Sequence, residues 1–297
     1  MRNLLSVFLL IALIAACKKD EPTPVAPPGP PPTADPQLII KFSFDSTQAR
    51  LDNLGLPSGI ATGNSAQHPK FNELSVHYIE LAQSEWTGLG NGAIIYESPM
   101  STAGGDTAID HNASIRVGEG GIFLSLPLNS IPTDTYVYLR ASLSYQNYDI
   151  KLRINTPVLL DLTGTVASFI GQNTYIQSYT IKDSSIAVNA NKLQGYWGFE
   201  SIYSVVTGQA PSGATTVPNP IFATSPVPQG SCIVTGAFSP SVLTITGSET
   251  SDIVIVLSCS TNNSFEWKDD DMDGFYEPLD GDTVVDMGIR GLIPVIQ

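Results

Sequence analysis

Residues that carry most enzymatic and nucleic-acid chemistry are scarce in this sequence. Among 297 residues there are 3 histidines and 3 cysteines, and charged side chains make up only 14% of the chain. The 14 basic residues face 28 acidic ones, which leaves a net charge of −14. An acidic chain without a basic stripe repels phosphate groups at long range. We therefore expect no nucleic-acid partner, whereas cationic ligands remain compatible with this charge.

Catalytic motifs are equally sparse. The three histidines are His68, His77 and His111, and none belongs to a metalloprotease helix motif. No GxSxG nucleophile elbow accompanies them. Paired carboxylates for glycoside hydrolysis depend on a separation in space that a sequence does not give. The low histidine content and the absence of these motifs predict a protein that is not an enzyme.

Long amphipathic helical patterns are missing as well. Short runs of β-branched and aromatic residues recur instead, separated by Gly, Pro, Ser and Thr. Leu38, Ile40 and Phe42 alternate in this way, as do Leu74 and Val76. The fold class predicted is all-β, an antiparallel β-sandwich of the Ig-like or jelly-roll-like kind. We predict strands over 38–44, 72–81, 122–128, 136–145, 148–154, 174–181, 185–190, 196–206, 232–238, 242–246 and 253–260.

Two segments of this pattern need separate comment. Gln146 and Asn147 fall between two predicted strands, so we expect a turn there and a meander around it. Residues 158–170 fit either a strand or a short helix, because Gly164 interrupts the run and its periodicity does not decide.

The start of the chain has the pattern of an export signal. Arg2 precedes an apolar run over 4–14, which is too short for a transmembrane helix but suits the core of a signal peptide. The stretch from Ile14 to Cys17 resembles the lipobox of a bacterial lipoprotein signal. The resemblance implies cleavage before Cys17 and acylation of its thiol and amine, with palmitate as a typical acyl group. Several acyl chains give stable membrane anchoring.

The residues after Cys17 indicate where the anchor goes. Lys18, Lys19, Asp20 and Glu21 look like the short lysine-plus-acid export tag of Bacteroidota lipoproteins. That resemblance implies an outer-membrane protein displayed at the cell surface, with an inward orientation as the alternative. The Pro-rich residues 22–36 cannot bury a core, and we expect them to form an extended spacer.

This organisation divides the chain into three parts. They are a lipoprotein signal peptide over 1–16, a lipid anchor and Pro-rich tether over 17–37, and a β-sandwich domain over 38–297. A Pro-rich stretch at 207–230 is predicted as a loop, and it leaves open whether the domain contains a second small β subdomain.

One local motif near the C-terminus has clear chemical content. Asp269, Asp271 and Asp273 stand at positions one, three and five of a calcium-binding loop. Gly274 follows at the sharp turn of position six. The remaining candidate ligands are the carbonyl of Phe275 and the carboxylates of Glu277 and Asp280. The sequence therefore predicts calcium as a cofactor, since hard carboxylate and carbonyl oxygens are the ligands it prefers.

The motif resembles the EF-hand loop and its extracellular relatives, with two departures. Asp280 stands in place of the long bidentate glutamate, and the flanks 265–268 and 283–287 predict strands instead of helices. We therefore expect a structural clip between two strands, with an affinity in the weak extracellular range of about 10⁻⁴ to 10⁻³ M. The alternative is an acidic, solvated turn.

Nearly all charged residues around this motif are acidic. Nine acidic residues lie between Glu266 and Asp286, and Lys268 is the only basic residue among them. Like charges at this density repel one another. We expect this corner to be the least stable part of the domain when no cation is bound.

Cysteine usage leaves a redox question open. Once Cys17 is acylated, Cys232 and Cys259 are the remaining cysteines, and both fall in predicted strands. Such a pair can oxidise outside the cytoplasm. The alternatives are a disulfide between them and two buried thiols, because their Cα separation cannot be obtained from the sequence.

A second family resemblance concerns the aromatic stretch 195–201. Together with the strand at 72–81 and the turn at 131–136, it resembles the MbnP-like periplasmic β-sandwich proteins. In that family a tyrosine and tryptophan strand accompanies copper handling, and the low histidine content here departs from the pattern. Tyr196 and Trp197 are therefore either core aromatics between two sheets or rings of an exposed ligand-binding groove.

These observations favour a non-catalytic, lipid-anchored cell-envelope protein. We expect a calcium-stabilised surface binding or adhesion module whose partners are the membrane and a glycan or protein ligand outside the cell. One alternative is a glycan-binding accessory lipoprotein of a nutrient-uptake system. The other is a periplasmic copper-handling protein.

Overall fold

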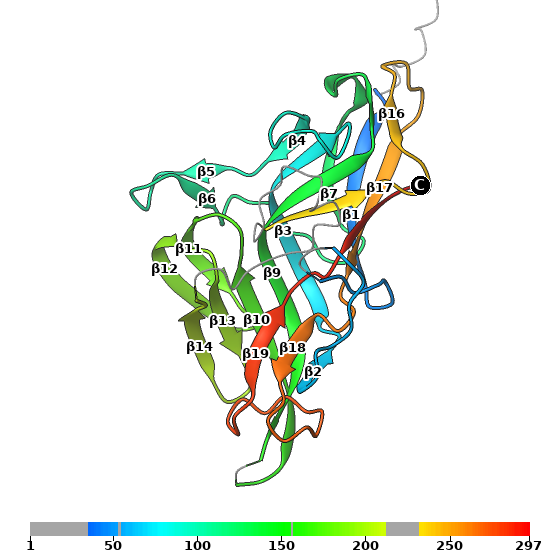
Figure 1. Ribbon diagram of the computed structural model, residues 1–297. Helices are drawn as coiled ribbons and strands as arrows, with labels where there is room; N and C mark the ends of the chain where they lie inside the picture. Colours follow the sequence, from blue (N-terminus) through cyan, green and yellow to red (C-terminus); the bar gives the residue numbers. More distant parts are fainter. Residues whose placement is uncertain (1–34, 53–54, 156, 212–231) are drawn as a thin grey trace, which may run out of the picture. The chain divides into compact units, whose positions relative to one another are not determined.

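The computed structural model describes residues 35–297, apart from 53–54, 156 and 212–231 (Figure 1). Residues Asp35–Gln297 form one compact unit by their contacts. The predicted signal peptide, Cys17 and nearly all of the tether lie outside the described residues, as does most of the loop predicted at 207–230. Where the chain is described, no helix is both long and apolar enough for a membrane crossing.

The fold is all-β, as predicted. The described residues contain no α-helix and one short 3₁₀ turn, η1 (Leu128–Ser130). The largest sheet has seven strands, and six of them follow the order β14-β13-β10-β9-β3-β4, while β15 pairs with β9. They are β3 (Lys70–Ala82), β4 (Ala93–Glu97), β9 (Tyr138–Ile154), β10 (Leu160–Phe169), β13 (Tyr196–Glu200), β14 (Val205–Gln209) and β15 (Ile233–Ala237).

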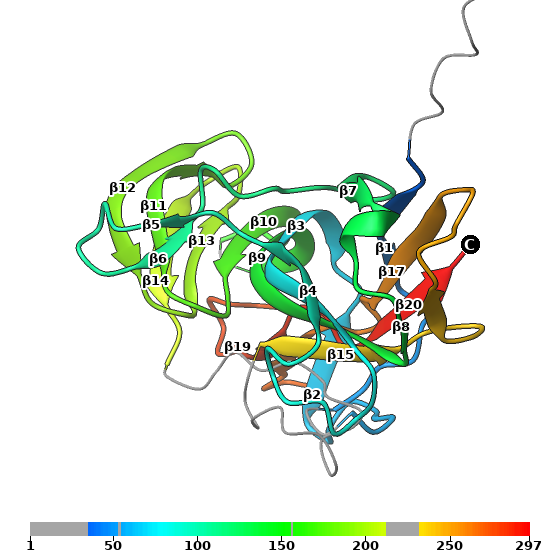
Figure 2. The same cartoon turned by 90° about the horizontal axis from the view of Figure 1, so that it is seen from above.

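A four-stranded sheet packs on each face of this large sheet. One has the order β20-β17-β1-β7, and the other has the order β12-β11-β6-β5. The first contains β1 (Gln37–Asp45), β7 (Ile122–Pro127), β17 (Ile253–Ser260) and β20 (Leu292–Ile296). The second contains β5 (Met100–Ser101), β6 (Ala108–Asp110), β11 (Thr174–Thr180) and β12 (Ser185–Lys192). In Figure 2, β11 and β12 lie on one side of β10 and β13, and β1 and β17 lie on the other.

Two smaller sheets complete the described part. One pairs β16 (Leu243–Ile245) with β8 (Asp134–Tyr136). The other has the order β19-β18-β2 and joins β2 (Asn64–Gln67), β18 (Phe265–Lys268) and β19 (Thr283–Met287). This last sheet positions the acidic motif, because residues 269–282 connect β18 to β19.

Two hydrophobic cores hold the layers together. The larger one contains Ile40 and Phe42 from β1, Leu74 from β3 and Leu257 from β17, all fully buried. The smaller one lies on the opposite face of the large sheet and contains Phe169, Tyr179 and Tyr196, among others. Alternate residues of β9 and β10 therefore face different cores, which is the period-two pattern of strands buried on both faces.

The turn predicted at Gln146 and Asn147 is wrong. Both residues lie inside β9, which runs unbroken over 17 residues. Asn147 is buried and hydrogen-bonded: its Nδ2 donates to the carbonyl of Ile181 at 2.7 Å, and its Oδ1 accepts from Asn72 Nδ2 at 2.9 Å. Turn-forming residues can occupy a central strand when their amides find partners across the neighbouring layers.

Two further predictions need correction. The strand expected over 196–206 is a hairpin, since the amide of Ser201 donates to the carbonyl of Ser204 at 2.9 Å between β13 and β14. The sheets are also not entirely antiparallel, because β1 pairs with β17 and β11 pairs with β6 in parallel. Residues 158–170, for which the sequence fitted either a strand or a short helix, contain the strand β10.

Candidate metal site and adjoining cleft

The acidic motif forms the connection of a β-hairpin. Its flanks are β18 and β19, which pair antiparallel, so the strands predicted at 265–268 and 283–287 are confirmed. The buried rings of Phe265 and Trp267 on β18 contact Tyr276 of the connection, with ring centroids 5.1 and 5.6 Å away. This aromatic cluster holds the second half of the loop against the core.

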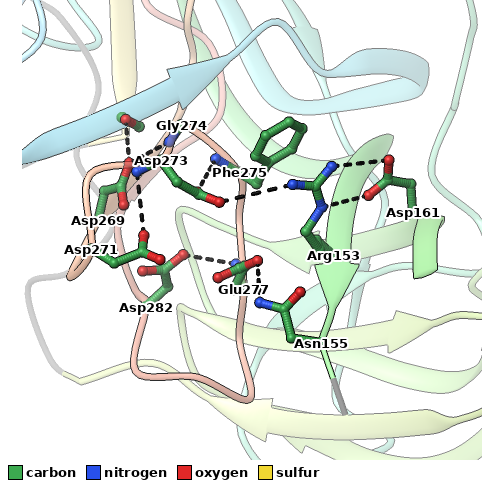
Figure 3. Close-up of polar contacts among 11 residues, drawn as sticks. Arg153, Asn155, Asp161, Asp269, Asp271, Asp273, Gly274, Phe275, Glu277 and Asp282 are labelled. Atoms are coloured by element: carbon green, nitrogen blue, oxygen red, sulfur yellow. Dashed lines mark hydrogen bonds and ion pairs between the residues drawn. The ribbon is translucent and has the colours of Figure 1, made fainter. Parts of the chain in front are cut away.

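Three predicted ligands come together in this loop. Asp269, Asp271 and Asp273 each offer a carboxylate oxygen, and these three atoms lie within 4.8 Å of one another. Local hydrogen bonds produce the arrangement, because Asp271 Oδ1 accepts from the amide of Asp273 at 3.2 Å and Asp273 Oδ1 accepts from the amide of Phe275 at 2.9 Å (Figure 3). Gly274, with φ +83°, reverses the chain where an ordinary side chain would be strained.

Asp269 differs from its two neighbours in being buried. It is 4% exposed, and its Oδ2 accepts hydrogen bonds from the Ser65 hydroxyl at 2.6 Å and the Gly274 amide at 2.9 Å. Its Oδ1 is buried and finds no hydrogen-bond partner among the described residues. A buried carboxylate oxygen without a partner costs free energy, and a positive ligand beside it would offset that cost.

The electrostatics of the three groups agree with that conclusion. Burial by itself would raise the pKa of Asp269, but its hydrogen bonds from Ser65 and Gly274 outweigh burial and lower the pKa. Desolvation raises the pKa of Asp271, and the charges of Asp273 and Asp269 raise it further. Ionised together, these carboxylates repel one another, and a bound cation would remove that repulsion.

Two other predicted ligands, the carboxylates of Glu277 and Asp280, are not brought into this group. Glu277 is buried, and its Oε1 accepts from Asn155 Nδ2 at 2.6 Å. Asp280 is exposed and donates its amide to the carbonyl of Glu277 at 3.0 Å. Among the described residues, the close group contains the aspartates at positions one, three and five only. Phe275, the predicted carbonyl ligand, presents its ring to the guanidinium of Arg153, 3.2 Å from the ring centroid.

Asp282 is a structural residue of the loop that the sequence reasoning missed. Its Oδ1 accepts from the amide of Asp270 at 3.1 Å. Its Oδ2 accepts from the amide of Glu277 at 2.7 Å (Figure 3). One carboxylate therefore ties the two halves of the loop together. The available signal was its position immediately before a predicted strand, where an aspartate can bond to earlier backbone amides.

Charge repulsion in this corner is weaker than the local count of acidic residues predicts. Three arginines lie here, and two of them are distant in sequence. Arg50 pairs with Glu266, and Arg153 lies 3.8 Å from Asp273. The third, Arg290, pairs with Asp286 at 2.5 Å. Arg153 also binds Asp161 through two hydrogen bonds of 2.7 and 3.1 Å. Ion pairs with described residues therefore cover four of the nine acidic residues and leave Asp269 and Asp271 of the close group without one.

Tyr196 and Trp197 point to opposite faces of β13. Tyr196 is buried in the smaller core, with its ring 5.8 Å from that of Phe169, so the core interpretation holds for this residue. Trp197 is partly buried and lines a cleft of about 540 Å³ between β10, β13 and β14 and the β18–β19 hairpin. Tyr276, Pro278 and Leu279 of the acidic loop line the same cleft.

The cysteines and histidines form no further site in the described chain. Cys232 and Cys259 are both buried, and no disulfide joins them, so of the two alternatives the disulfide is wrong. The reason is their placement: Cys259 lies in β17 of a four-stranded sheet, whereas Cys232 directly precedes β15 of the seven-stranded sheet. Cys232 Sγ accepts from Gln194 Nε2 at 2.9 Å.

Burial among aromatic rings lowers the pKa of His111 to about 3, so this imidazole is neutral at physiological pH.

Comparison with protein-family models, with curated proteins and with solved structures finds no match.

Proposed function

We propose that this chain is a non-catalytic, lipid-anchored cell-envelope protein whose β domain is a calcium-stabilised binding module. The observation that carries the proposal is the buried Asp269 Oδ1, which lacks a partner among the described residues and belongs to a group of three close carboxylates. Calcium takes six to eight oxygen ligands in flexible geometry. The aspartates would supply part of that set, and loop carbonyls and water would supply the rest.

Calcium would act here as a clip between two strands. The loop joins β18 to β19, and these strands lie against the aromatic cluster of Phe265, Trp267 and Tyr276. A ligand that binds only the folded state stabilises it in proportion to RT ln(1 + [L]/Kd). With the expected Kd of about 10⁻⁴ to 10⁻³ M, 10 mM calcium would add roughly 1.4 to 2.7 kcal/mol.

The test is the melting temperature of the purified chain in EDTA, calcium, magnesium and copper. We expect calcium to raise Tm by roughly 3 to 10 °C over EDTA, which is the shift that this free energy gives for a domain of this size. Asp271→Asn and Asp273→Asn should each abolish most of the rise.

Asp270→Asn is the matched control for these variants. Asp270 lies between two ligands, but its carboxylate pairs with Lys268 at 2.8 Å instead of joining the group. Its substitution should leave the calcium effect intact. If all three variants lose the calcium-dependent rise in Tm equally, the effect is one of general charge. If calcium does not raise the Tm of the unsubstituted chain, the motif is an acidic turn that binds no calcium.

The lipid anchor is proposed from the sequence around Cys17, which resembles a lipobox. We expect the native chain to fractionate with the outer membrane and its first mature residue to carry acyl groups visible by mass spectrometry. Cys17→Ala should release the chain into the soluble fraction. Unchanged membrane association of this variant would contradict lipid anchoring.

A glycan-binding accessory lipoprotein is the second candidate function, and Trp197 supports it. This ring lines a cleft from a position on β13 that is not fully buried, and aromatic rings are the usual stacking surface for sugars. Binding of one polysaccharide, reduced by Trp197→Ala, would favour it. A copper-specific rise in Tm would instead favour the copper-handling alternative.

A further inference from the structure

Two aromatic rings that line the cleft, Trp197 and Phe199, each lie directly against a glycine of a neighbouring strand. A Cβ on Gly208 of β14 would lie 2.4 Å from Trp197 Cζ2, and a Cβ on Gly164 of β10 would lie 2.2 Å from Phe199 Cε2. Any other residue at these two positions would push the rings out of place. The glycines therefore leave the space that the Trp197 and Phe199 rings occupy at the cleft.

The opposite wall comes from the acidic loop and from β19. Tyr276, Pro278 and Leu279 belong to the part of the loop that Asp282 ties back to Asp270, and Val285 follows on β19. Leu279 is 71% exposed and Val285 is 53% exposed. Large apolar side chains left open to solvent around a concavity are typical of a surface that a ligand covers.

The charge of the lining restricts what this ligand can be. None of the described residues that line the cleft is Lys, Arg or His, so an anionic group would find no cationic partner there. The single carboxylate of the lining, Asp286, already pairs with Arg290 at 2.5 Å. Most lining residues are aliphatic or aromatic, and polar ones such as Ser168, Ser204 and Gln209 are fewer, so an apolar molecule fits this lining better than a sugar with many hydroxyls.

We propose that this cleft binds one small, uncharged, apolar molecule between the Trp197 and Phe199 rings and the loop wall at Tyr276 to Leu279. Its volume of about 540 Å³ falls within the range of small-molecule sites. This inference deepens the proposed function and depends on it for one feature, which is that calcium orders the loop wall. Ligand binding and calcium binding then strengthen each other by the same factor.

The experiment is a titration of the full chain carrying Cys17→Ala with the uncharged dye Nile red, in calcium and in EDTA. The substitution removes the proposed acylation site, so that no detergent micelle competes for the dye. We expect saturable binding of one dye per chain with a blue-shifted emission, and several-fold weaker binding in EDTA. The anionic dye ANS, run in parallel, should bind far more weakly.

Trp197→Ala should weaken Nile red binding about tenfold or more, since one large aromatic contact is lost. Trp86→Ala is the matched control, because Trp86 is 67% exposed in the segment between β3 and β4 and does not line the cleft. The Trp86→Ala variant also reveals any dye that binds near Trp86 and not in the cleft. Gly208→Ala provides a second variant, which displaces the ring without removing it and should weaken binding as well.

The possible failures of this experiment are distinguishable. No saturable dye binding, or equal binding by the Trp197→Ala and Trp86→Ala chains, overturns the cleft proposal even where calcium still raises Tm. Equal binding in calcium and EDTA overturns the calcium-ordered wall and leaves the cleft. No effect of calcium on Tm, together with dye binding that Trp197→Ala abolishes, overturns the metal site alone. Stronger binding of ANS than of Nile red overturns the choice of an uncharged ligand.

Discussion

At the scale of single residues, one carboxylate determines the shape of the acidic loop. Asp282 accepts amide hydrogen bonds from Asp270 and Glu277, so it joins the half of the loop that holds the carboxylate group to the half that lines the cleft. Its side chain is buried, and water cannot replace these bonds at low cost. The loop therefore has a preformed geometry that does not depend on the cation alone.

Asp282→Asn should destabilise the chain by about 1 to 3 kcal/mol, because an amide has one acceptor oxygen and would turn its NH₂ toward a backbone donor. Asp280→Asn is the matched control, since Asp280 is exposed and lies outside the carboxylate group. Urea unfolding in EDTA measures both. Equal stability of the two variants would remove Asp282 from the account, and loss of the calcium effect in Asp280→Asn would restore the twelfth-position ligand that the sequence predicts.

At the scale of strands, a fully buried ion pair fixes β3 against β9. Glu80 and Arg140 are both 0% exposed, with Arg140 Nη1 3.4 Å from Glu80 Oε2, and Glu80 Oε1 accepts from the Gly92 amide at 2.8 Å. The carboxylate thus serves three segments of the large sheet. Removing one member of such a pair leaves a buried charge without compensation.

Glu80→Ala should therefore cost about 3 to 5 kcal/mol of unfolding free energy. Glu73→Ala, on the same strand, is the control: Glu73 lies 3.8 Å from Arg116, and both side chains are partly exposed. Such a surface pair contributes less than about 1 kcal/mol. Denaturant unfolding of both variants measures the difference, and similar costs would mean that the buried pair is not the tie between these strands.

Strands with simple alternation could be predicted from the sequence. The ranges 253–260, 265–268 and 283–287 agree with β17, β18 and β19, because short apolar or alternating runs there end at clear turn residues. The prediction failed in β9, where Gln146 and Asn147 lie in a buried strand and not in a turn. Asn147 has turn chemistry, but Asn72 and the carbonyl of Ile181 provide partners for its amide. Partners so far away in sequence leave no local pattern.

The site was predictable to a similar extent. The spacing of Asp269, Asp271 and Asp273 identified the group that the structure brings together, because hydrogen bonds between close neighbours form it. Glu277 and Asp280 were assigned by analogy with a helical frame, and the loop follows a strand frame instead. The arginines near the loop could not be predicted, since Arg50 and Arg153 come from distant elements.

At the scale of the whole molecule, the chain combines a proposed lipid anchor with a β domain that carries a candidate metal loop and a cleft. The seven-stranded sheet provides one side of the cleft, and the β18–β19 hairpin provides the other. The loop that carries the candidate ligands Asp269, Asp271 and Asp273 also carries Tyr276, Pro278 and Leu279 of the cleft wall. A cation bound at the loop would therefore order the cleft wall, because only two residues separate the candidate ligand Asp273 from Tyr276 of the wall.

The most direct test of this account is equilibrium dialysis of the purified chain against radiolabelled calcium. We predict one ion bound per chain, with half-saturation at about 10⁻⁴ to 10⁻³ M and loss of binding when Asp271→Asn and Asp273→Asn are combined. The Asp270→Asn chain should bind as the unsubstituted chain does. Absence of saturable calcium binding, or binding that the double substitution leaves unchanged, would contradict the central claim.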